Sequence, residues 1–199
     1  MPPIPRDRAL GYRHGVQIPE AVHKTVRRRM GLLDRAQRAV IMRASVIGRR
    51  FDLSILIAAA PYAEATLQSA LDRACRLHLL VADESVSGRF AFRHALIRDA
   101  VYAEFVGSAT RPLHRRIARA LERSLVAGAA TLEDLAYHAW AGGDARRAVR
   151  YNELAGDNAA AVHAQSDART YYGRARSLLD VDSPAYARLS EKFAAMAED

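Results

Sequence analysis

The chain has 199 residues, half of them hydrophobic and 26% charged, which is enough for one domain or two small ones with an apolar core. Its single cysteine excludes an intramolecular disulfide framework and a zinc site built from several cysteines. No apolar run approaches the roughly 20 residues of a membrane-spanning helix, and the first residues lack the apolar stretch of a signal peptide. The sequence therefore predicts a soluble, cytoplasmic protein without a membrane partner.

The net charge of +8 is concentrated at one end of the chain. Residues 1–50 contain 12 of the 30 basic residues but only 3 of the 22 acidic ones, whereas the remainder of the chain is nearly balanced. A local basic excess is typical either of a solvated helix face or of a patch that faces an anion. Both interpretations stay open at the level of the sequence.

The first half of the chain begins with an irregular stretch and continues as helices. Residues 1–18 are rich in proline, glycine and arginine and show no period. Helical spacing of apolar residues then predicts helices over about 19–33, 34–47, 52–60 and 62–77. Asp34 is the expected cap of the second helix and Gly48 its end, while Asp52 or Ser54 is expected to cap the third.

The period changes after these helices. Residues 79–82 and 89–93 alternate like strands, and Gly88 belongs to the turn between them. The order of helix, helix, short helix, helix and hairpin is that of a winged helix-turn-helix. Two strands alone are marginally stable in water, so we expect this hairpin to pack against the helices.

The rest of the chain is predicted to be helical, over about 94–105, 112–125, 131–140, 144–164, 166–179 and 184–197. The longer helices start near Pro112 and at Asp144, which is the expected cap of its helix. The two starts lie about 32 residues apart, a spacing typical of tetratricopeptide-like repeats. An irregular helical bundle is the alternative. We thus expect a mainly α protein with an N-terminal segment (1–18), a winged-helix domain with a small β-hairpin (19–105) and tetratricopeptide-like α-helical hairpins (106–199).

Motifs of common catalytic sites are absent from the sequence. It contains no phosphate-binding P-loop, no dinucleotide fingerprint and no nucleophile elbow. No two of the seven histidines are three to five residues apart, so no helix presents a histidine pair to a metal. We therefore expect no catalytic residue, no metal ligand and no enzyme activity in this chain.

DNA recognition by the predicted winged helix is disfavoured by charge. The four charged residues of the helix over 62–77 cancel, and so do those of the hairpin. A duplex reader normally faces phosphates with basic side chains, so a protein-interaction module is the preferred interpretation. The alternative is a DNA-binding regulator that uses Arg73, Arg76 and Arg89.

The chain resembles a known group of proteins in three segments, residues 44–52, 67–81 and 90–102. The most specific part of this resemblance is the run from Phe92 to Tyr102. The chain resembles the bacterial signal-transduction ATPases with numerous domains, including large ATP-binding LuxR-type regulators and adenylate-cyclase-linked predicted ATPases. The resemblance covers about residues 18–180. It implies a winged helix and tetratricopeptide-like repeats that follow a P-loop ATPase core.

His94 is the one site residue that the resemblance singles out. The resemblance implies that His94 is related to the histidine of the Met-His-Asp motif, in which a winged-helix histidine contacts the nucleotide phosphate. Arg93 and Ala95 flank His94 in place of Met and Asp, so the match is partial. The alternative is a histidine that only caps or packs at the junction of strand and helix.

Three parts of that group are missing from this chain: the phosphate-binding loop, the acidic strand that holds magnesium and the C-terminal DNA-binding helices. We therefore expect a fragment or a short reading frame of such a regulator. ATP or ADP would bind to the missing ATPase core and not to this chain. The expected function is a non-catalytic regulatory module that relays nucleotide state. Its partners would be that core or a parent regulator, an inducer or protein on the repeats, and a second copy through self-association. The further alternative is an inactive remnant.

Overall fold

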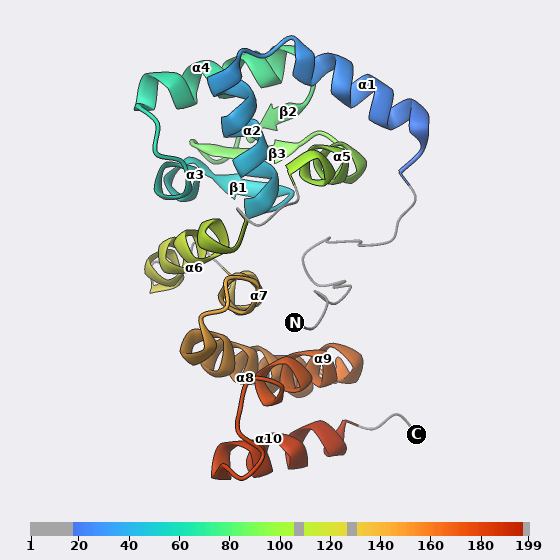
Figure 1. The fold of residues 1–199 in the computed structure, drawn as a ribbon, viewed down its shortest axis with the longest axis vertical. Coiled ribbons are helices and arrows are strands. Elements are labelled where there is room, and N and C mark those ends of the chain that lie inside the picture. The colour runs from blue at the N-terminus through green and yellow to red at the C-terminus, as the bar shows by residue number, and fades with distance from the viewer. Residues whose placement is uncertain (1–17, 106–109, 127–130, 197–199) are drawn as a thin grey trace. The chain divides into compact units, whose positions relative to one another are not determined.

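The computed structural model describes residues 18–105, 110–126 and 131–196, so most of the segment predicted to be irregular lies outside the described residues. The chain divides into two compact units, Met1–Ala120 and Leu121–Asp199. The division falls inside helix α6 (Thr110–Val126), whereas the sequence predicted a boundary between residues 105 and 106. Figure 1 shows the order of the helices and strands in each unit.

The first unit contains helices and a small sheet in the predicted order. Its elements before α6 are α1 (Glu20–Gly31), α2 (Arg35–Ile47), β1 (Arg50–Asp52), α3 (Leu53–Ala59), α4 (Glu64–Arg76), β2 (Leu80–Ala82), β3 (Arg89–Phe92) and α5 (Ala95–Phe105).

The side-chain cap predicted for α2 is confirmed, and Asp52, one of the two residues predicted to cap α3, is the N-cap residue of that helix. The Asp34 carboxylate accepts a hydrogen bond from the Gln37 N–H at 2.8 Å, and the Gln37 side chain accepts from the Asp34 N–H. Asp52 precedes α3, but its side chain makes no capping hydrogen bond. It instead accepts from Arg89 Nε at 2.9 Å, because strand pairing places Asp52 opposite Arg89.

A third strand, β1, was not predicted. The sheet is antiparallel in the order β1-β3-β2, and Phe51 of β1 pairs with Phe90 of β3. The two rings stack with centroids 6.0 Å apart, and Phe51 is also 6.2 Å from Phe92. Three residues are too few for alternation to be visible in a sequence, and tertiary packing of Phe51 against β3 decides the strand.

The core of the first unit lies between α2, α4, α5 and the sheet. Its fully buried side chains include Val40 and Ile41 of α2, Leu67 and Leu71 of α4, and Phe92 of β3. Val40 and the buried Ala44 are four residues apart on α2, as are Leu67 and Leu71 on α4, so one face of each helix is buried. The hairpin thus packs on the helices, as its marginal stability requires.

The second unit is helical throughout its described part and packs each helix on the next. Its elements after α6 are α7 (Leu132–Ala141), α8 (Ala145–Ala161), α9 (Gln165–Arg176) and α10 (Pro184–Ala195). Asp144 caps α8 as predicted. Helices α8 and α9 end three residues earlier than predicted, because His163 turns the chain after α8 and Ser177 is the C-cap of α9.

The fold is thus mainly helical with one small antiparallel sheet, which confirms the fold class at this level. The longest helices, α6 and α8, have 17 residues each. Within the described residues no helix combines the length and apolar character needed to cross a bilayer.

Candidate binding groove

The first unit has an open groove of about 590 Å³ beside α1 and the start of α5, two helices that pack together. Four basic side chains line it and are called here the basic cluster: Arg29, His78, Arg93 and His94. Four apolar side chains also line it and are called the apolar cluster: Val22, Val26, Leu96 and Ile97.

The helical period of α1 brings both kinds of side chain to the groove. Val22, Val26 and Arg29 are spaced by four and then three residues, so they share one face of α1. Leu96 and Ile97 belong to the first turn of α5. Val26 and Ile97 are buried, whereas Val22 and Leu96 are half-buried and line the open part.

Two hydrogen bonds to backbone carbonyl oxygens hold the segments that carry the basic cluster. An N–H of the Arg29 guanidinium donates to the His78 carbonyl oxygen at 3.2 Å, which joins α1 to the second residue after α4. The Arg93 N–H donates to the Leu79 carbonyl oxygen at 3.0 Å. Residues that lie 64 positions apart in the sequence, Arg29 and Arg93, therefore line one groove.

His78 has the left-handed conformation, with φ of 55°. The Leu79 N–H donates to the Ala74 carbonyl oxygen and the His78 N–H to that of Cys75. This pattern ends many helices, and glycine usually occupies the left-handed position because it has no Cβ. A histidine there directs an imidazole towards the groove at a conformational cost.

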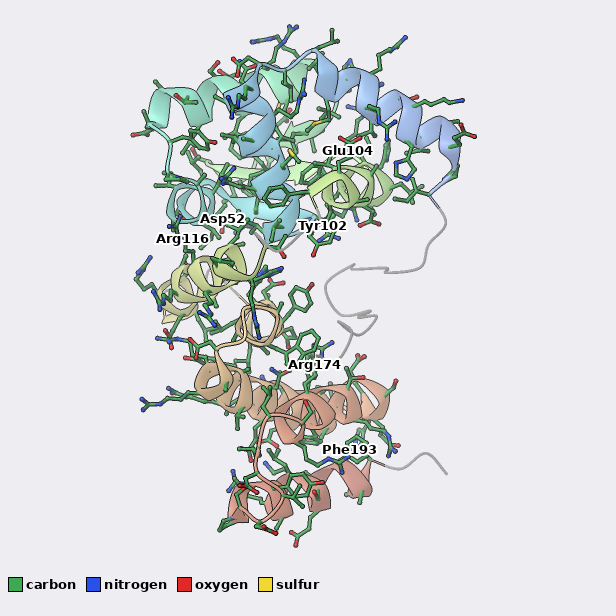
Figure 2. All side chains as sticks on the ribbon, in the orientation of Figure 1. Asp52, Tyr102, Glu104, Arg116, Arg174 and Phe193 are labelled. Atoms are coloured by element: carbon green, nitrogen blue, oxygen red, sulfur yellow. The ribbon has the colours of Figure 1, made fainter. Side chains whose placement is uncertain are left out.

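The charges around the groove favour an anion. Among the described residues, no aspartate or glutamate lines it. The two carboxylates of α5 pair with other arginines: Asp99 with Arg98 at 2.9 Å, and Glu104 with Arg27 at 3.3 Å. Glu104 is labelled in Figure 2 on α5. The positive charge of the basic cluster is thus not balanced by the acidic side chains of the neighbouring helix.

The arginines of the DNA-binding alternative lie outside this groove. Arg73 and Arg76 are on α4, where Arg73 is half-buried and Arg76 exposed. Arg89 is paired with Asp52 across β1 and β3. The α4 face also carries an exposed Asp72, which accepts a hydrogen bond from Gln68.

A second titratable cluster in the first unit is buried and structural. Arg98 is 2% exposed and donates to the Ser45 carbonyl oxygen at 2.8 Å and to Asp99, and it lies over the Tyr102 ring. Burial, together with the positive charge of Arg98, lowers the pKa of His114 to about 4. His114 is therefore neutral near pH 7.

The remaining candidates for chemistry are weak ones. Burial is the main cause that raises the pKa of the Cys75 thiol, which disfavours the reactive thiolate. Within the part of the chain that the structure describes, no group of three His, Cys, Asp or Glu side chains could hold a metal ion.

Comparison of the chain with protein-family models, with curated proteins and with solved structures gives no match.

Sequence reasoning identified His94 but missed Arg29 and His78 as its neighbours. Arg29 belongs to a run of three arginines, and the period of α1 distinguishes it because Val22 and Val26 share its face. His78 carries no such signal, because only the end of α4 and its contact with Arg29 place it at the groove.

Proposed function

We propose that the chain is a non-catalytic regulatory module, a winged helix followed by tetratricopeptide-like hairpins, that relays the nucleotide state of an ATPase core. The topology of the first unit supports the winged helix. Three helices, α2, α3 and α4, precede the hairpin of β2 and β3, and β1 completes an antiparallel sheet in the order β1-β3-β2. This is the arrangement expected of a helix-turn-helix with a wing.

The observation that carries the proposal is the placement of His94 in a groove with three other basic side chains. His94 lies between β3 and α5. Its basic neighbours are Arg29 of α1, His78 just beyond the end of α4, and Arg93 at the junction of β3 and α5. Imidazole N–H groups and guanidinium groups donate hydrogen bonds to phosphate oxygens. The groove therefore suits the phosphate of a nucleotide held by a neighbouring ATPase domain or chain.

The groove would relay the nucleotide state because a phosphate bound there contacts several elements of the first unit. A phosphate held by the basic cluster would bridge α1, the end of α4 and the start of α5. Loss of that phosphate would leave the two arginines of the cluster, Arg29 and Arg93, in one groove without a counter-charge. Two nucleotide states would then differ in the free energy of this arrangement, which is what a population shift requires.

Titration of the isotope-labelled chain with pyrophosphate and with ADP, followed by NMR, tests the proposal. We expect the amide signals of Arg29, His78, Arg93 and His94 to shift together, with weak affinity because the ATPase core is absent. His94→Ala should reduce the shifts. Arg116→Ala, which removes an exposed arginine of α6 labelled in Figure 2, should leave them unchanged. Shifts absent from the groove, or spread over the arginines generally, would refute it.

The DNA-binding alternative makes a different prediction for the same chain. Duplex binding should then weaken steeply between two salt concentrations, and Arg76→Ala should weaken it without affecting pyrophosphate. The Arg89–Asp52 pair and the exposed Asp72 disfavour this alternative. Duplex binding at micromolar affinity with a steep salt dependence would overturn the preference.

The second unit supplies the surface proposed for a protein partner or inducer. A shallow groove of about 540 Å³ follows α8, where Leu154 is 41% exposed among charged side chains of both signs, Arg146, Arg150, Glu153 and Asp157. An exposed leucine within a rim of charged side chains is a feature of protein-binding surfaces. We propose that a partner of the module contacts α8 here.

A further inference from the structure

We infer that the groove beside α1 and α5 binds a small amphiphile, an anionic head on a short apolar tail such as an alkyl or aryl phosphate. The inference rests on the proposed function in one respect, since the same basic cluster receives the anion. It goes further because it assigns a free ligand to this chain and gives the apolar half of the groove a role.

The two kinds of side chain on α1 are arranged along one helix face. Val22 and Val26 precede Arg29 on that face, so the apolar part and the cationic part of the groove follow each other along the helix axis. Leu96 and Ile97 extend the apolar part on α5. A ligand with a charged end and an apolar end matches this sequence of surfaces.

An inorganic anion alone would leave the half-buried members of the apolar cluster, Val22 and Leu96, in contact with water. Val22 and Leu96 are half-buried, so a tail placed against them would remove further apolar surface from water. An uncharged apolar molecule would in turn leave Arg29 and Arg93 without a counter-charge near it. Only a molecule with both parts satisfies both clusters.

The size of the groove favours a small molecule over a folded partner. Its volume of about 590 Å³ lies within the range of small-molecule sites, roughly 300–1,000 Å³. A largely apolar lining with a few polar groups at one side is also usual for such sites. Two sources share this chemistry, a free alkyl or aryl phosphate and the phosphate head of a lipid.

Calorimetric titration with inorganic phosphate, hexyl phosphate and hexanol separates head from tail. We expect hexyl phosphate to bind about tenfold or more tightly than phosphate, because each buried methylene tightens binding by about two- to fourfold. Hexanol should bind more weakly than hexyl phosphate, since it lacks the charge. Vesicles of phosphatidylcholine with phosphatidic acid test the lipid source, and we expect no binding to them above that of pure phosphatidylcholine.

Two variants with matched controls locate the ligand. Val22→Thr keeps the shape of the side chain and should weaken hexyl phosphate several-fold without affecting phosphate. Ile57→Thr replaces an exposed aliphatic side chain of α3 by threonine, outside the groove, and should affect neither. Arg93→Gln should weaken both ligands, whereas Arg116→Gln should weaken neither.

The outcomes separate this inference from the proposed function. Equal affinity for phosphate and hexyl phosphate, with both weakened by Arg93→Gln, overturns the inference and leaves the proposed function standing. Absence of binding by any of the anions contradicts both. Binding to the phosphatidic acid vesicles without binding of hexyl phosphate overturns the small-ligand assignment, and so does hexanol binding as tightly as hexyl phosphate.

Discussion

At the scale of single residues, His78 and Arg98 differ in what their environments require. His78 is exposed and adopts a backbone conformation that glycine adopts more easily. Arg98 is a buried cation whose charge is matched by Asp99. We therefore expect that the first residue can be replaced without loss of stability, whereas the second cannot.

We predict that His78→Gly stabilises the chain by about 0.5–1 kcal/mol, because glycine relieves the left-handed conformation. The same variant should weaken pyrophosphate binding, since it removes one basic side chain from the groove. His163→Gly is the matched control, because His163 has φ of 58° after α8, outside the groove. Denaturant unfolding and calorimetric titration measure the two effects. If His78→Gly bound pyrophosphate as the unmodified chain does, His78 would have no part in the site.

We predict that Arg98→Met destabilises the first unit by about 3–5 kcal/mol, because Asp99 is left half-buried without its partner. The double variant Arg98→Met with Asp99→Asn should recover part of this loss. The pKa of His114 should rise in both variants, since the charge of Arg98 helps to lower it. Thermal unfolding and an NMR titration of the imidazole check the two statements. A His114 pKa that stays at its original value would show burial to be the only cause.

At the scale of elements, close helix approach decides the packing of the second unit. A Cβ added to Gly156 of α8 would lie 2.5 Å from a ring carbon of Tyr172 on α9. The Tyr172 hydroxyl donates to Asp157 at 2.8 Å, and Lys192 of α10 lies 5.6 Å from its ring centroid. The ring is therefore held on both sides, and the two helices meet where α8 has no side chain.

We predict that Gly156→Ala destabilises the second unit by about 1–3 kcal/mol, because the held ring cannot move away from the new methyl group. Gly31→Ala is the control, since a Cβ at Gly31 of α1 meets nothing within 4 Å. That variant should change stability by less than about 1 kcal/mol. Urea unfolding of both variants makes the comparison. Equal stability of Gly156→Ala and the parent chain would contradict the close approach.

At the scale of the whole molecule, the buried His114 and the half-buried Asp134 give opposite dependences of stability on pH. The pKa of His114 in the first unit is lowered to about 4, so the unfolded chain binds a proton there that the folded chain does not. Burial raises the pKa of Asp134 in the second unit to about 6, so the folded chain binds a proton that the unfolded chain releases. Between about pH 4 and pH 6 the two effects oppose each other.

We predict that Asp134→Asn makes the whole molecule lose stability more steeply as the pH falls from about 6.5 to 4. The variant removes Asp134, whose protonation stabilises the folded chain at low pH, and keeps His114, whose protonation favours the unfolded chain. The His114 contribution alone amounts to about 2–3 kcal/mol across this range. His114→Gln should show the opposite sign, with stability rising as the pH falls towards 4. Unfolding free energies at several pH values measure both slopes, and parallel curves for the two variants would contradict the assignment.

Self-association is the expectation that belongs to the molecule as a whole. Exposed apolar residues occur on both units, for example Leu32 and Ile57 on the first and Val162 and Val181 on the second. Sedimentation at several concentrations measures whether they bring copies together.

An inactive remnant would bind neither pyrophosphate nor a partner, which distinguishes that alternative from the proposed module.

Local pattern was sufficient for the helices, the hairpin and two of the caps. Asp34 and Asp144 cap their helices as predicted, because a carboxylate before an apolar period satisfies free N–H groups wherever the helix lies. Strand β1 escaped prediction because Phe51 is held by contacts with Phe90 and Phe92, about 40 residues away in the sequence.

The sequence by itself determined the helical class and the hairpin, since these depend on period and turn residues, and a local run of residues singled out His94 as a candidate. Only the tertiary structure brought Arg29 and His78 to His94, paired Asp52 with Arg89, and set Gly156 against Tyr172. The physical reason is distance along the chain. Local propensities act over a few residues, whereas a groove or a helix crossing depends on which faces pack together once the apolar surfaces are buried.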